Sequence, residues 1–188
     1  MHVHLSVVDK DGNNVFTVDK NKQPQGLFSH AIGGLLKTTP DFLSFYAPHS
    51  NSYRRLVHNA DHAPTTLSWG NENRTALIRL PEASAEATRL EFRVASADSN
   101  PYLVFASVLA SVYAGIQGKL QHDKETIGNA HEKHPPSLGV TWREAVEKTS
   151  VSSLVKDFFG EQFQQCYQCV KESEIKRFES TITDFEYH

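Results

Sequence analysis

Hydrophobic and polar residues alternate in two short segments, residues 75–80 and 89–94, which predicts two strands. In the first segment Arg79 is the only charged residue, and in the second Glu91 lies between two arginines at every other position. Such period-two patterns are typical of strands that bury one face. The segment between them contains Pro, Ala, Ser and Glu and predicts the connecting turn. If the strands pair, one face of the sheet carries guanidinium groups and a carboxylate. That face is suited to anionic substrates, although a solvated face with ordinary ion pairs has the same pattern.

The first eight residues alternate in the same way. His2, His4 and Ser6 share one face of this predicted strand, and Val3, Leu5 and Val7 share the other. Two histidines at this spacing on a strand can both approach a metal or an anionic ligand, but a surface or structural role fits the spacing as well. The polar run 9–14 predicts a turn, and residues 15–18 are the expected returning strand of a hairpin.

Helical periodicity covers most of the remaining chain and predicts an α+β fold. The predicted helices are residues 26–37, 41–46 after Pro40, 100–120, 141–148, 150–158 and 161–184. The helix 100–120 is apolar on most sides, so we expect it to be buried among several neighbours. Residues 47–64 and 121–138 are polar and predict loops. We expect a mainly antiparallel sheet backed by helices, in one domain that spans residues 1–188.

Composition narrows the class of protein. The 188 residues carry a formal net charge of -3, which argues against a general nucleic-acid binder. No apolar run reaches membrane-spanning length, and the N-terminal residues do not form a signal peptide, so we expect no membrane partner. Cys166 and Cys169 lie inside a helical pattern without nearby histidine, and we expect both to be reduced. These features predict a cytoplasmic protein.

Five motifs resemble, in their order and spacing, the catalytic domain of the glutamine synthetase family. They are M-H-V-H-L-S from Met1, N-S-Y-R-R-L-V from Asn51, N-R-T-A-L-I-R from Asn73, R-L-E-F-R from Arg89 and A-D-S-N-P-Y-L from Ala97. The resemblance covers essentially the whole chain, and its helical C-terminal part is most similar to the glutamate–polyamine ligase branch. It implies an ATP-dependent ligase that joins glutamate to ammonia or an amine through γ-glutamyl phosphate, with Mg²⁺ or Mn²⁺ as cofactor.

The resemblance also implies roles for individual residues. His2 and Glu91 match metal ligands; His4, Ser6, Arg79 and Arg89 match the nucleotide site; Arg55 and Arg93 match residues that hold the carboxylates of glutamate; and Arg74 matches a phosphate-binding catalytic arginine. Asp61 and His62 lie where ammonia-using members have a flap glutamate before Ala-Pro. A neutral imidazole at that place holds ammonium poorly and favours a larger amine, whereas Asp61 could take over the glutamate's role.

The family's other metal-binding glutamates and its N-terminal domain have no counterpart in this sequence. We therefore expect an N-terminally shortened catalytic domain that is inactive by itself and belongs to a homo-oligomeric enzyme in its full-length form. One carboxylate and one histidine are too few ligands for two catalytic metals. Two alternatives have the same arginines: a catalytically inactive remnant that binds nucleotide or glutamate for assembly or regulation, and a plain structural domain.

Overall fold

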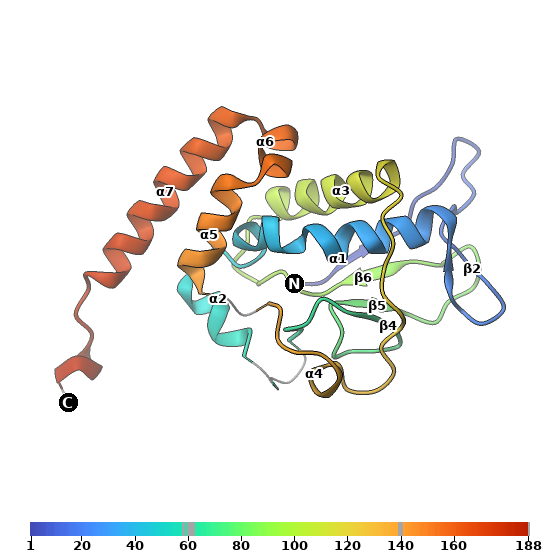
Figure 1. Cartoon of the computed structure of the whole chain (residues 1–188), viewed down its shortest axis with the longest axis horizontal. Coiled ribbons are helices and arrows are strands. Elements are labelled where there is room, and N and C mark those ends of the chain that lie inside the picture. Colours follow the sequence, from blue (N-terminus) through green and yellow to red (C-terminus); the bar gives the residue numbers. More distant parts are fainter. Residues whose placement is uncertain (58, 60–62, 139–140, 188) are drawn as a thin grey trace.

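A four-stranded sheet with helices along one face forms the centre of the molecule (Figure 1). The computed structural model describes the chain except for residues 58, 60–62, 139–140 and 188. The strands are β1 (Val3–Leu5), β4 (Trp69–Asn71), β5 (Ile78–Leu80) and β6 (Leu90–Phe92), in the spatial order β1-β6-β5-β4. The β1–β6 and β6–β5 pairs are antiparallel and the β5–β4 pair is parallel. The described residues thus form the predicted α+β fold, with a sheet that is mainly antiparallel.

The strand register separates an apolar face from a polar one. Val3 pairs with Phe92, and Phe92 pairs with Ile78; all three side chains are buried. The next positions place His4 opposite Glu91 and Glu91 opposite Arg79. Side chains at successive positions of a strand point to opposite faces, so these polar residues share the face that the helices leave open.

The predicted hairpin after β1 is only partly correct. The turn at residues 9–14 is present, and an isolated bridge joins Val8 to Asn14. The following strand β2 (Thr17–Val18), however, pairs with β3 (Pro24–Gln25) in a separate small sheet. Strand β1 instead pairs along its length with β6, which comes much later in the sequence.

Helix α1 (Gly26–Tyr46) is one continuous helix, although two helices separated at Pro40 were predicted. Proline lacks the amide hydrogen that the helix needs at an interior position. In the preceding turn the Thr38 and Thr39 hydroxyls donate to the carbonyl oxygens of Gly34 and Leu35 at 2.9 and 2.6 Å, which ties both side chains to the helix backbone. Burial of both segments in the same core favours the continuous helix.

Helix α3 (Pro101–Gln117) crosses α1 at close range. A Cβ added to Gly34 would lie 2.2 Å from the carbonyl oxygen of Ser111, and one added to Gly115 would lie 2.2 Å from that of His30. Asn100 caps α3 by accepting hydrogen bonds from the amides of Tyr102 and Leu103. The expectation that α3 is buried on most sides is wrong: its outer face exposes Tyr102, Phe105, Leu109 and Tyr113.

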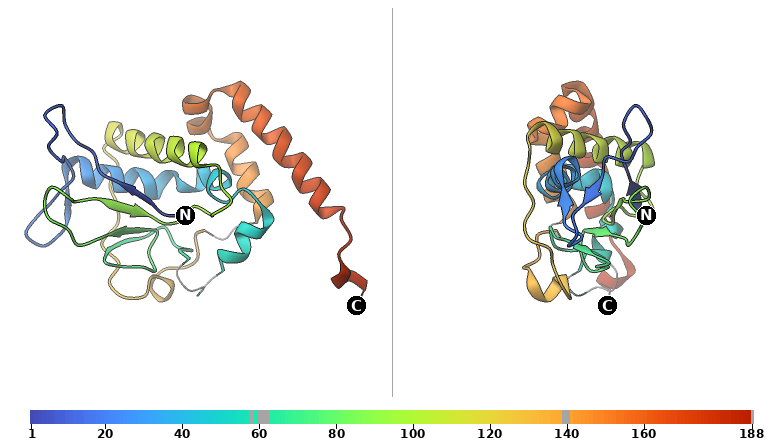
Figure 2. Two further views of the ribbon diagram at one scale, coloured as in Figure 1. Left: turned by 180° about the vertical axis from the view of Figure 1, so that it is seen from behind. Right: turned by 90° about the vertical axis from the view of Figure 1, so that its right-hand side faces the viewer.

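The C-terminal helices form a group at one end of the sheet (Figure 1). They are α5 (Trp142–Val151), α6 (Ser153–Phe159) and α7 (Glu161–Glu179), followed by the 3-10 helix η1 (Asp184–Tyr187). Thr141 and Glu144 form a capping box at the start of α5. Helix α7 ends earlier than predicted, and the left view of Figure 2 shows the end of the chain extending away from the sheet. Cys166 and Cys169 are exposed free thiols on α7, as predicted.

The two predicted loops each contain a helix. Helix α2 (Ser50–Arg55) holds the N-S-Y-R-R motif, and α4 (Ala130–Lys133) lies in the second segment. The second segment also braces β4, because the indole of Trp69 donates to the Asp123 carbonyl at 2.8 Å and the Thr126 amide donates to the Trp69 carbonyl at 2.9 Å. Among the described residues, none of the helices combines the length and apolar character needed to cross a membrane.

Candidate active site

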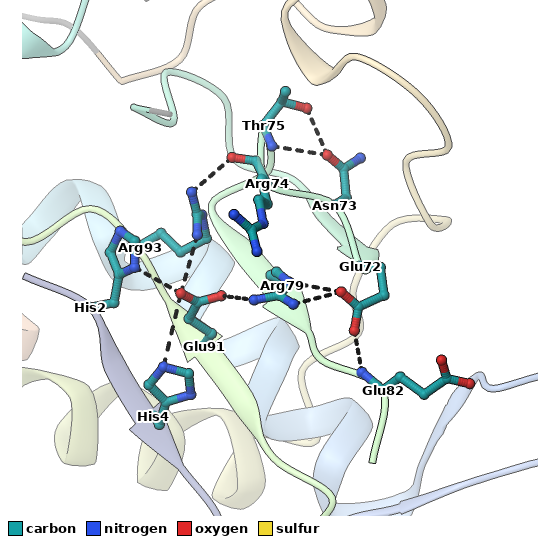
Figure 3. Close-up of polar contacts among 10 residues, drawn as sticks. All are labelled: His2, His4, Glu72, Asn73, Arg74, Thr75, Arg79, Glu82, Glu91 and Arg93. Carbon is teal, nitrogen blue, oxygen red and sulfur yellow. Dashed lines mark hydrogen bonds and ion pairs between the residues drawn. The ribbon is translucent and has the colours of Figure 1, made fainter. Parts of the chain in front are cut away.

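Glu91 is the centre of a charged cluster on the open face of the sheet (Figure 3). Its side chain is 5% exposed and lies within contact distance of two arginines and a histidine. Oε1 lies 2.7 Å from Nδ1 of His2 and accepts from Nη1 of Arg93 at 3.2 Å, and Oε2 accepts from Nη1 of Arg79 at 3.0 Å. Nε2 of His4 is 3.9 Å from Oε1. The structure thus brings together four of the residues that the sequence predicted around this carboxylate.

The strand register explains this cluster. His4 and Arg79 are the register partners of Glu91 on its two sides, so the sheet itself places their side chains in one row. Arg93 follows two residues later on β6's own chain and returns to the same face. The alternation predicts which of these side chains share a face of their own strand, and the strand register decides which of them meet.

The charge state of the cluster follows from its contacts. Burial raises the pKa of Glu91, but the contacts with Arg79, Arg93 and His2 more than offset this and hold the pKa below its ordinary value. Burial, together with the nearby Arg93, lowers the pKa of His2. At neutral pH the site therefore contains a carboxylate, two guanidinium groups and a neutral imidazole. Such a set can bind an anion through its arginines, and a hard cation through His2 and Glu91.

Arg74 lies next to this cluster on the turn that leads into β5. Its carbonyl oxygen accepts a hydrogen bond of 2.9 Å from Nη2 of Arg93. Its own side chain is exposed and points toward Arg79 and Arg93 (Figure 3). Asn73 holds this turn, because its amide nitrogen donates to the carbonyls of Thr126 and Gly128 at 2.7 and 2.8 Å.

Arg55 lies beside the cluster and donates its hydrogen bonds to residues that follow Arg93 in the chain. From α2 it donates to the Val94 carbonyl at 2.5 Å and to Oγ of Ser96 at 3.2 Å, directly after the segment that carries Arg93. Burial lowers the pKa of the Arg55 guanidinium, and Asp98 partly offsets the shift. The predicted substrate arginines thus approach the same end of β6 from two sides.

Two predicted nucleotide residues lie outside the cluster. Arg89 donates to the Ala87 carbonyl at 3.2 Å and lines a separate pocket with Lys22, Glu72 and Glu82. Ser6 is exposed beyond the end of β1. Alternation placed Arg89 on the same face as Glu91 and Arg93, but Arg89 belongs to the turn that precedes β6, which begins at Leu90. The predicted flap residues Asp61 and His62 lie outside the described residues.

Sequence reasoning missed Glu72. Its carboxylate accepts from Nη2 and Nε of Arg79 at 2.5 and 3.2 Å, and also from the backbone amide of Glu82. The pKa of Glu72 is lowered, chiefly by its hydrogen bond with Arg79. Its position immediately before the N-R-T motif was the available signal.

The cluster supplies only part of a metal site. In the described part of the chain, no group of three or more His, Cys, Asp or Glu side chains is arranged to hold a metal ion. His2 and Glu91 nonetheless have the ligand chemistry of a partial site for Mg²⁺ or Mn²⁺, an ion that commonly keeps water and phosphate oxygens in its remaining positions.

Comparisons with known proteins identify the family of the whole chain. The family described as "Glutamine synthetase, catalytic domain" matches residues 1–188. The chain is 32% identical over 186 residues to gamma-glutamylputrescine synthetase of Escherichia coli, covering 99% of this chain and 39% of that protein. It is 33% identical over 185 residues to gamma-glutamylethanolamide synthetase of Streptomyces coelicolor, covering 98% of this chain and 39% of that protein. It is 34% identical over 197 residues to glutamine synthetase of Thermotoga maritima, covering 99% of this chain and 44% of that protein.

The chain therefore spans less than half the length of these relatives. The match nevertheless extends over all of its own residues, including each strand that carries the Glu91 cluster. This chain belongs to the glutamine synthetase catalytic-domain family.

Proposed function

We propose that this chain forms part of the active site of an ATP-dependent ligase that joins glutamate to an amine. The observation that carries the proposal is the row of His4, Glu91 and Arg79 across three strands, with His2 and Arg93 on the same carboxylate. Membership of the family supports it, since the relatives are named as ligation enzymes: glutamine, γ-glutamylputrescine and γ-glutamylethanolamide synthetases.

In the proposed reaction, the γ-carboxylate of glutamate attacks the terminal phosphate of ATP, and ADP leaves. The amine then attacks the carbonyl carbon of γ-glutamyl phosphate, and phosphate leaves with its bonding electrons. Both steps bring anions together, so catalysis depends on positioning and charge neutralisation. Arg74 and Arg79 would bind phosphate oxygens, and Arg55 and Arg93 would hold the two carboxylates of glutamate. Arginine retains its charge throughout.

His2 and Glu91 would hold one Mg²⁺ or Mn²⁺, which when bound neutralises phosphate charge. His4, Ser6 and Arg89 would contact the nucleotide. The amine is ammonia or a polyamine such as putrescine, and Asp61 and His62 would decide between them. The complete enzyme is proposed to be a homo-oligomer.

The test is phosphate release from ATP in the presence of glutamate and Mg²⁺ or Mn²⁺, with no amine, ammonia, putrescine or a longer polyamine. Arg74→Ala removes an exposed arginine of the site, and Arg143→Ala removes an exposed arginine that pairs with Glu179 on α7. In the full-length protein that contains this chain, we expect amine-dependent release that Arg74→Ala lowers at least about 100-fold and Arg143→Ala leaves unchanged. Failure of the wild-type protein to bind ATP or glutamate would contradict the proposal.

A second candidate is a binding domain without catalysis. The specific observation in its favour is that His2 and Glu91 form only a pair of metal ligands among the described residues. ATP binding that depends on Arg74, without phosphate release under any amine, would identify this function.

A further inference from the structure

Glu72 has a backbone conformation that its side chain does not favour. It follows the last residue of β4 and has a φ of 51°, in the left-handed region. Glycine, and to a lesser degree asparagine, adopts this region easily, whereas other residues are strained there. The amide of Glu72 donates to the Leu80 carbonyl at 3.0 Å, which holds the backbone beside β5. A strained residue persists only where the surrounding structure fixes it, so the contacts that hold Glu72 matter here.

Both oxygens of this carboxylate are used, although the side chain is 49% exposed. Oε2 accepts from Nη2 and Nε of Arg79, at 2.5 and 3.2 Å. Oε1 accepts from the backbone amide of Glu82, which lies in the turn after β5. The side chain therefore bridges the end of β4, the middle of β5 and the turn that follows β5. An ordinary surface ion pair makes no such backbone contact.

Arg79 is consequently held between two carboxylates (Figure 3). Glu72 takes the Nε and Nη2 nitrogens, and Glu91 accepts from Nη1 at 3.0 Å. A guanidinium group has five N–H donors. Within the described part of the chain, these contacts use three donors and leave one N–H on Nη1 and one on Nη2. The side chain is 16% exposed, so its orientation is strongly restricted.

We propose that Glu72 is a positioning residue, which orients the remaining donors of Arg79 toward a phosphate group of the nucleotide. The inference rests on the proposed function. Because Glu72 and Glu91 already fix the Arg79 side chain in the folded protein, its conformational entropy is lost on folding. Ligand binding then does not have to order this side chain again. Glu72 itself makes no contact with the ligand.

The variants that test this are Glu72→Gln, which keeps the shape and removes the charge, and Glu72→Gly, which removes the side chain and accepts the positive φ without strain. Glu82→Gln is the matched control. It removes an equal charge from a neighbouring exposed carboxylate, whose ion pair is with Lys22, and keeps the Glu82 amide that Glu72 uses. Binding of ATP, inorganic triphosphate and adenosine is measured by calorimetry on each protein. The Nε–H signal of Arg79 is followed by NMR without ligand.

We expect both Glu72 variants to weaken ATP and triphosphate binding about 10-fold, as for loss of one charge-assisted contact, and to leave adenosine binding unchanged. The Arg79 Nε–H signal should lose its hydrogen-bonded shift in Glu72→Gly and show a smaller shift than the wild type in Glu72→Gln, whose amide oxygen is an uncharged acceptor. Glu82→Gln should resemble the wild type. A general structural role would instead weaken adenosine and ATP binding equally, and that result would overturn the inference.

An unchanged Arg79 signal, or unchanged ATP affinity in variants that fold, would overturn it as well. If the wild-type protein binds neither ATP nor triphosphate, the proposed function fails and the inference fails with it. That outcome is recognised from the wild type alone, before any variant is compared.

Discussion

Arg79 and Glu91 are direct register partners on β5 and β6, and Nη1 of Arg79 lies 3.0 Å from Oε2 of Glu91. Because side chains alternate between the faces of a sheet, a shift of one residue in this register would turn one member of the pair toward the core. The charged cluster therefore forms only when β5 and β6 pair in this register.

Replacement of Glu91 by alanine should destabilise the fold strongly. The Arg93 side chain is only 3% exposed, and without Glu91 its buried charge loses a close carboxylate. We expect a loss of about 3 kcal/mol in the free energy of unfolding, measured by urea denaturation. Glu82→Ala breaks an exposed pair with Lys22 and should cost less than about 1 kcal/mol. Equal effects for the two variants would show that burial of the cluster contributes no stability.

The crossing of α1 and α3 should not tolerate even one added methyl group. Gly34→Ala places a Cβ 2.2 Å from a backbone carbonyl oxygen, where no flexible side chain can move away. We expect thermal unfolding to report a loss of about 2 kcal/mol, despite the higher helix propensity of alanine. Gly118→Ala, whose nearest neighbour would be 3.1 Å away, is the control and should cost less.

Acid should release the segment that braces β4. Burial raises the pKa of Glu125, but hydrogen bonds from the Asn71 amide and the side chains of Gln23 and Asn71 hold it below the ordinary value. A lowered pKa in the folded state means that the stabilisation is complete above the ordinary glutamate pKa and is lost as the pH falls through the lowered one.

Glu125→Gln should therefore make the free energy of unfolding less dependent on pH in this acidic range, while Glu132→Gln, at an exposed residue of α4, should not. Denaturant unfolding at a series of pH values measures this slope. Identical slopes for the wild type and Glu125→Gln would contradict the prediction.

Asn100 should act in stability and not in ligand binding. Its side chain accepts from the amides of Tyr102 and Leu103, so Asn100→Ala removes the cap of α3. We expect a loss of about 1 kcal/mol in unfolding free energy and unchanged ATP affinity, with Asn100→Asp close to the wild type. A drop in ATP affinity that exceeds the loss of stability would assign this motif a direct role in binding.

Local patterns were sufficient to predict the elements whose two faces differ. The alternation predicted that Arg79, Glu91 and Arg93 share one face, and that His2 and His4 share one face of the first strand, because the period of a strand is independent of tertiary context. The pairing of β1 with β6, which brings the two sets together, is not contained in that pattern. The caps of α3 and α5 were equally predictable, since Asn100 and Thr141 act on amides only two or three residues away.

Other features depend on contacts that no local pattern contains. Pro40 remains inside α1 because burial in a common core outweighs a missing hydrogen bond. The strand after the first turn pairs with β3, while β1 pairs with the distant β6. The role of Glu72 arises from a turn that folds its side chain back over β5, and sequence spacing alone does not reveal such a turn.

Residues 72–77 join β4 to β5, which lie parallel, whereas parallel neighbours usually require a connection of a dozen or more residues. This connection is short for a parallel pair, so its length determines the register of β5 and with it the position of Arg79 on the sheet. The same connection carries Asn73 and Arg74. The length of the segment is therefore constrained as strictly as the identity of Glu72 and Arg74. Among natural variants of this chain, we expect insertions and deletions only outside the segment that joins the two strands.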